Sequence, residues 1–169
     1  MTLTFTVRGM PAPQGSKKFM GMRGGKGIMV ESSQKLKPWR LAVCYAAREA
    51  IMATRKASEE GTVSWYPVSG PLSVTMVFTL PRPKSCPKSR LWPDKKPDLS
   101  KLVRSTEDAL IDAGIIDDDA RIVHLDPWKV FPIPWGFPRS TDQEKHIFDG
   151  LLRMFELDSP GAVIEIRQL

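Results

Sequence analysis

Cysteine and histidine are scarce in this 169-residue chain, which has two of each. Cys44 and Cys86 lie far apart and belong to no Cys-x-x-Cys or Cys/His cluster, so the sequence predicts neither a disulfide nor a zinc site. His124 and His146 have no second ligand close in sequence and are poor candidates for metal binding. No apolar run is long enough for a membrane-spanning helix, and the N-terminal segment lacks the apolar core of a signal peptide. We therefore expect a cytoplasmic protein without a membrane anchor.

Positive charge is in excess, with 25 lysines and arginines against 19 aspartates and glutamates, a net charge of +6. Such a balance favours a polyanionic partner, because each cation that meets a phosphate releases counterions. Hydrophobic residues make up 41% of the chain, which is enough for one core. The 15 prolines fall in clusters, and this is typical of loops and strand boundaries.

Periodicity predicts alternating strands and helices. Strands are expected at residues 3–7, 27–30, 72–80, 120–131 and 162–166, where β-branched and apolar residues are frequent or alternate with polar ones. Apolar residues at helical spacing predict helices at residues 34–55 and 100–113, the second ended by Gly114, and a short one at 146–155. The Gly- and Pro-rich segments 9–27, 81–97 and 132–140 are expected to be loops. This order predicts a single α/β (α+β) domain over residues 1–169, with helices packed against a mixed sheet.

Aspartates stand at both ends of the helix predicted at residues 100–113. Asp98 comes just before it, and Asp117, Asp118 and Asp119 come just before the following strand. A helix and a turn that lead back in this way can bring both acidic groups to one edge of the fold. Mg²⁺ prefers carboxylate, water and phosphate oxygens, and such an ion can activate water to cleave a phosphodiester.

A structural interpretation of the same residues stays open at this point. Asp98 would then favour the helix N-terminus as a cap or dipole partner, and the three aspartates would form a solvated turn. Arg104 and Asp108, four positions apart, would form a surface ion pair.

The same stretch resembles the RusA family of Holliday junction resolvases. That family has a K/R-x-D-hydrophobic-D-x-L helix opening, a basic residue, D-A-L, a glycine and a D-D-x-Q-like strand entry. The matching positions here are Lys96-Pro97-Asp98-Leu99, Leu102, Arg104, Asp108-Ala109-Leu110, Gly114 and Asp118-Asp119-Ala120-Arg121, followed by Ile122-Val123. The early PAPQGSKK and the KPWR segment from Lys37 to Arg40 are similar to the family's N-terminal region. The resemblance therefore spans most of the chain.

The resemblance implies a homodimeric endodeoxyribonuclease of phage or prophage type that resolves four-way and other branched DNA. It implies paired symmetric nicks in recombination and repair, with Mg²⁺ as cofactor and Mn²⁺ as a substitute. Carried over by position, Asp98, Asp118 and Asp119 would be the catalytic, metal-binding carboxylates. Arg104 would replace a catalytic lysine and steady phosphate charge, although arginine cannot lose its proton.

Ser100 departs from the family, which usually has a second aspartate at this position. Three outcomes are open: the site works with the remaining aspartates and Ser100 holds a water; Asp108 or Asp117 substitutes; or catalysis is weak or lost. The last outcome would leave a junction-binding protein.

Basic residues in two loops are the candidate DNA contacts. One set lies among glycines, which let backbone approach phosphate closely, and the other flanks Trp92 just ahead of Asp98: Lys17, Lys18, Arg23 and Lys26 in the first, and Lys84, Lys88, Arg90, Lys95 and Lys96 in the second. Trp92 would either stack on an exposed base or pin its loop to the core. A third hypothesis, a plain nucleic-acid-binding domain with a structural acidic run, predicts equal affinity for junction and duplex.

Overall fold

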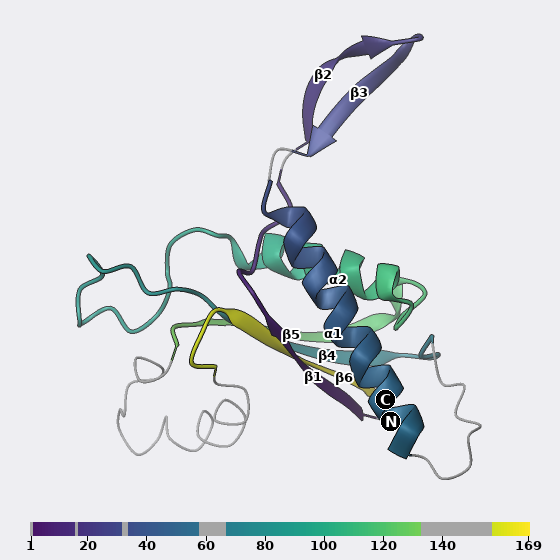
Figure 1. The fold of residues 1–169 in the computed structure, drawn as a ribbon, viewed down its shortest axis with the longest axis vertical. Coiled ribbons are helices and arrows are strands. Elements are labelled where there is room, and N and C mark those ends of the chain that lie inside the picture. The colour runs from purple at the N-terminus through teal and green to yellow at the C-terminus, as the bar shows by residue number, and fades with distance from the viewer. Residues whose placement is uncertain (1, 16, 32–33, 58–66, 133–156) are drawn as a thin grey trace.

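A computed structural model describes residues 2–15, 17–31, 34–57, 67–132 and 157–169. Its main sheet has the strand order β1-β6-β4-β5 (Figure 1), formed by β1 (Thr2–Arg8), β6 (Gly161–Gln168), β4 (Leu72–Thr79) and β5 (Ile122–Val130). β6 runs antiparallel to both of its neighbours, whereas β4 and β5 are parallel. The predicted mixed sheet is therefore confirmed.

Two helices cover one face of this sheet (Figure 1). They are α1 (Leu36–Ala57) and α2 (Leu99–Ala113), and both agree with the helices expected from periodicity. Gly114 ends α2 with φ of 76°, the left-handed conformation that glycine adopts without steric cost. Among the described helices, none is long and apolar enough to cross a membrane.

The strand β4 is buried along its whole length because both of its faces are covered. On one face Val74, Met76 and Phe78 belong to the core beneath α1 and α2. On the other face, Val77 lies in a smaller cluster with Val130, Leu157 and Val163, against which Trp92 and Trp128 pack. The expectation that residues 72–80 form a central strand is confirmed.

Trp39 joins the two helices to the sheet. Its side chain is 1% exposed, its ring lies 6.4 Å from that of Phe78, and its Nε1 donates a hydrogen bond of 3.2 Å to Oγ1 of Thr106 on α2. At the surface, Arg40 forms ion pairs with Asp108 and Asp112 of α2. Apolar packing and these polar contacts together fix where α2 lies against α1.

The segment expected to be a loop at residues 9–27 contains a strand, and here the prediction was wrong. β2 (Lys17–Arg23) pairs with β3 (Lys26–Glu31) as an antiparallel hairpin that projects from the rest of the molecule (Figure 1). Its sequence, KKFMGMR, lacks the period-two alternation of a half-buried strand. The hairpin is instead set by Gly24 and Gly25, whose φ values of 58° and 78° form a two-residue turn suited to strand twist.

Two other boundaries differ from expectation or fall outside the structure. The strand expected from residue 120 begins at Ile122, because a short 3₁₀ helix, η1 (Asp119–Arg121), precedes it. The helix expected at residues 146–155, His146, and most of the expected 132–140 loop lie outside the described residues.

We predict that Thr106→Val lowers the free energy of unfolding by about 1–3 kcal/mol, the usual cost of leaving a buried donor unsatisfied. The substitution keeps the shape of the side chain but removes the acceptor for Trp39 Nε1. Urea denaturation measures the change, and Thr54→Val, which alters an exposed hydroxyl on α1, is the matched control. Equal stability of the two variants would contradict a structural role for this hydrogen bond.

Candidate functional site

Asp98 lies at the boundary between the Pro-rich loop and α2. It occupies the N-cap position with extended backbone angles, φ −68° and ψ 133°, but its side chain makes no capping hydrogen bond. The carboxylate instead accepts a hydrogen bond of 2.8 Å from Nζ of Lys101 and remains about half exposed. This contact, and then the nearby charges of Lys96 and Lys129, hold the pKa of Asp98 below its usual range. The purely structural interpretation of Asp98 as a side-chain cap does not hold in this structure.

The loop that precedes Asp98 is held by cations bonded to its carbonyl oxygens. Lys129 on β5 donates to the carbonyls of Lys95 and Pro97, at 3.1 Å each. Arg82 donates to the carbonyl oxygens of Pro87 and Arg90 and lies over the ring of Phe131. Because its backbone is bonded at both ends, the loop presents its side chains in a defined arrangement.

Trp92 also anchors this loop. The half-buried indole packs on the cluster formed by Val77, Val130, Leu157 and Val163, and its ring lies 6.5 Å from that of Trp128. Of the two roles considered for Trp92, the structure supports pinning the loop to the sheet.

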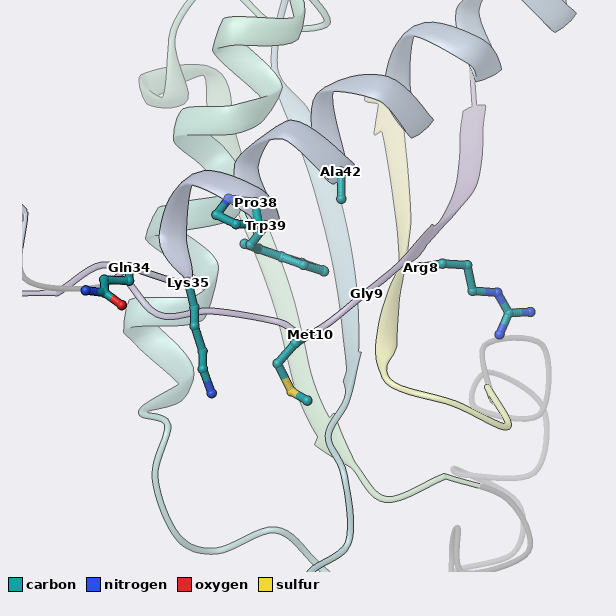
Figure 2. A pocket seen from close by; sticks show the side chains of 8 residues that line it. All are labelled: Arg8, Gly9, Met10, Gln34, Lys35, Pro38, Trp39 and Ala42. Atoms are coloured by element: carbon teal, nitrogen blue, oxygen red, sulfur yellow. The ribbon is translucent and has the colours of Figure 1, made fainter.

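Two hollows share Met10 and Lys35, and one of them is lined by Pro97, the residue before Asp98. One, of about 580 Å³, lies between the Pro-rich loop and the segment after β1, and its wall includes Arg90, Lys95 and Lys96. The other, of about 590 Å³, lies between the end of β1 and the start of α1, where Figure 2 shows Met10 and Lys35 extending in the same direction. Lys35, Arg90, Lys95 and Lys96 therefore line a concave surface that ends at Pro97, next to Asp98 in the chain.

The three consecutive aspartates have separate surroundings. Asp117 pairs with Arg121, and this contact is the main reason that its pKa is lowered. Asp118 caps η1, since its Oδ1 accepts a hydrogen bond of 2.8 Å from the Ala120 amide. Asp119, the first residue of η1, takes part in no side-chain hydrogen bond or ion pair with any residue that the structure describes. The turn thus uses two carboxylates structurally and leaves Asp119 available.

Glu107 on α2 is a candidate that the sequence pattern did not reveal. Its side chain is half-buried, and this burial raises the pKa of its carboxyl. The negative charges of Asp119 and then Asp108 raise it further, while Arg104 lowers it. The only signal in the sequence was spacing: Lys101, Arg104 and Glu107 recur every three residues after Asp98 and so share one helix face.

This face of α2 lies between the two acidic groups, with Asp98 at the start of the helix and Glu107 and the acidic turn near its end. Asp98 and Glu107 are nine positions apart, which corresponds to about 13 Å along an α-helix. Within the described ranges, no three His, Cys, Asp or Glu side chains lie together as a possible metal site. Asp98, Asp118 and Asp119 as they stand therefore do not fit a single magnesium ion, and Lys101 and Arg104 lie between their two locations.

The remaining predicted residues lie on α2, on β5, in the Pro-rich loop and in the β2–β3 hairpin. Asp108 faces α1 through Arg40 and not Arg104, so the expected Arg104–Asp108 pair is absent and Asp108 joins the helices. Ser100 is exposed in the first turn of α2, close to Asp98 in sequence. Nδ1 of His124 on β5 lies 2.9 Å from Oγ of Ser73.

The basic candidates divide between two segments. The Pro-rich loop carries Lys84, Lys88, Arg90, Lys95 and Lys96, and the β2–β3 hairpin carries Lys17, Lys18, Arg23 and Lys26.

We predict that Glu107→Gln raises stability at neutral pH by up to about 1 kcal/mol, the scale of partly exposed charges. The folded-state pKa of Glu107 is raised, so the charged carboxylate destabilises the fold above that pKa, and the cost disappears on acidification below its ordinary value. Thermal unfolding from pH 3 to pH 8 measures this, with Glu49→Gln on α1 as an exposed control. A stabilisation that is independent of pH would show that charge is not its cause.

Comparison with known proteins identifies the family. A family model described as Endodeoxyribonuclease RusA matches residues 9–133, which is well over half of the chain and includes the Pro-rich loop, α2 and the acidic turn. No curated protein matches the chain. The chain therefore belongs to the RusA family, whose members are endodeoxyribonucleases that hydrolyse phosphodiester bonds in DNA and act on junctions.

Proposed function

We propose that this protein is a structure-selective endonuclease that resolves four-way and other branched DNA by paired nicks, in recombination and repair. The observation that carries the proposal is the position of Asp98. Its carboxylate stands at the start of α2, is not used as a helix cap, and lies beside a concave surface lined by cations. Because the chain belongs to the RusA endodeoxyribonucleases, we propose that a scissile phosphate approaches this carboxylate.

The exposed face of α2 has the charges needed to hold a phosphodiester. Lys101 and Arg104 lie between Asp98 and the Asp119–Glu107 pair. We assign to Arg104 the stabilisation of negative charge that develops on phosphate oxygens during cleavage. The cations of the Pro-rich loop, Lys88, Arg90, Lys95 and Lys96, would contact the DNA backbone, which gives affinity and position but little sequence preference.

The proposal includes dependence on a divalent cation, Mg²⁺ with Mn²⁺ as substitute. It rests on the family and on the preference of these ions for carboxylate oxygen, not on a formed site, since the described carboxylates do not gather. By position in the family Asp98, Asp118 and Asp119 would hold the ion, but in this structure they lie apart and Asp118 caps η1, so binding requires that they come together.

The proposal also includes a homodimer acting in the cytoplasm of a host cell, for a protein of phage or prophage origin. Two coordinated nicks in a junction with two-fold symmetry need two active sites related by the same symmetry, and a two-fold dimer supplies them.

A second candidate function is junction binding with weak or absent cleavage. Two observations favour it: Ser100 replaces a family aspartate, and Lys101 already supplies a cation to Asp98. In that case the same surface would bind branched DNA without an adequate acidic site.

We predict that Asp98→Asn lowers cleavage of an end-labelled synthetic four-way junction in Mg²⁺ by more than about 100-fold. Substituting a residue that only hydrogen-bonds to a metal ligand already lowers activity by up to about 100-fold, and Asp98 is proposed as a ligand itself. Junction affinity should stay the same or increase, because one negative charge near phosphate is removed. Asp94→Asn, in the same loop but paired with Arg90, is the matched control. Wild-type nicking by the Asp98→Asn variant would refute the site, and activity in EDTA would refute the metal dependence.

We predict that Ser100→Asp lowers the Mg²⁺ concentration needed for half-maximal cleavage by about tenfold, because a carboxylate binds this ion more strongly than a hydroxyl. Ser100→Asn, of similar size but neutral, should behave like the wild type. Cleavage that appears only in the Ser100→Asp variant would favour the binding-protein function. Identical magnesium requirements for the Asp and Asn variants would exclude position 100 from the site.

A further inference from the structure

The β2–β3 hairpin carries three large apolar side chains that are exposed to solvent. Phe19 is 56% exposed and Met22 is 66% exposed, with Met20 exposed beside them. The hairpin projects away from the sheet and helices (Figure 1). A two-stranded hairpin is at best marginally stable in water by itself, and large exposed apolar groups on such an element are typical of a binding surface.

Strand register brings Phe19 and Met22 to the same face. Phe19 pairs with Met29 and Met22 pairs with Gly27, and positions 27 and 29 of one strand share a face. The irregularity between Phe19 and Gly21 makes this possible, because it inserts an extra residue into β2. A Cβ atom added at Gly27 would lie 3.2 Å from Cε2 of Phe19 and 4.0 Å from Sδ of Met22. The two side chains therefore form one apolar surface, the Phe19–Met22 shelf, over a glycine.

Two cations stand at the turn of the same hairpin. Arg23 and Lys26 are register partners across the two strands, and both are exposed. In sequence, the segment from Lys17 to Glu31 contains four lysines and arginines and one acidic residue. The combination of an aromatic group, a flexible thioether and flanking cations suits nucleic acid, since a base can stack on the ring while the cations meet its phosphates.

The geometry points to the Phe19–Met22 shelf as the element that distinguishes branched DNA from duplex, by packing on a base pair exposed at the branch point. This inference deepens the proposed function and rests on it. Apolar side chains that enter a duplex must first unstack it, at a cost of a few kcal/mol per step. At a branch point the stack is already interrupted, so the same contact forms with less cost there than within a continuous duplex.

Charge argues against a second copy of the hairpin as the partner of the shelf. Two such hairpins would bring like charges together, which disfavours association. DNA supplies the opposite charge, and a two-stranded ribbon is narrow enough to enter a groove.

The test compares binding of a fluorescein-labelled immobile four-way junction with binding of a duplex of equal length, by anisotropy in EDTA. We expect Phe19→Ala/Met22→Ala to weaken junction binding about tenfold or more and duplex binding less than about twofold, because only the junction contact includes stacking. Arg23→Ala/Lys26→Ala should weaken binding of both junction and duplex. It should also make the slope of log affinity against log salt concentration shallower by about two. Tyr45→Ala/Met52→Ala removes an exposed aromatic residue and an exposed methionine from α1 and is the control.

Because the anisotropy measurement in EDTA reports binding without cleavage, its result is independent of the nuclease proposal, which the cleavage assay alone tests. If the double alanine variant unfolds, single substitutions decide: Phe19→Trp should keep the preference for the junction and Phe19→Leu should lose it. The inference is overturned if the hairpin variant binds like the α1 control, if junction and duplex weaken equally, or if sedimentation shows that the variant loses an oligomer that the wild type forms.

Discussion

The packing of α2 against α1 on one face of the sheet is the constraint on which the candidate site depends. One face of α2 is buried through Leu102, Thr106 and Leu110, and Trp39 binds it to both α1 and the sheet. With that face fixed, helical periodicity leaves Lys101, Arg104 and Glu107 at the surface, in line with Asp98. The same packing returns the chain at Gly114, so that η1 brings Asp119 close to Glu107.

The electrostatics of the site follow from this arrangement. Positive groups lie between two acidic groups, and each acidic group has a different environment: Asp98 is exposed and its pKa is lowered by Lys101, whereas Glu107 is half-buried and its pKa is raised. A polyanion approaching this face meets cations first. The carboxylates lie at the two ends of the cationic stripe and do not meet at one ion in this arrangement.

Periodicity predicted both helices and the main-sheet strands because their apolar residues repeat with the spacing of a buried face. The strand β2 was missed because it lies outside the core and no burial pattern marks it, whereas its partner β3 agrees with the strand expected at residues 27–30. Only Gly24 and Gly25 indicate the turn that joins the two strands. For the site, the motif pointed to Asp98, Asp119 and Arg104 as candidates by position, but not to Glu107, whose surroundings depend on what faces it across the turn.

The sequence by itself determined the order of elements, the end of α2 at Gly114 and the family, since each depends on local spacing and residue type. Only the tertiary structure decided which partner each charge has. Asp108 pairs with Arg40 of α1 and not with Arg104, Trp92 packs on β-sheet side chains, and Lys129 holds the loop before Asp98. These contacts join residues distant in the chain, and their energies depend on burial and distance, which one-dimensional spacing does not contain.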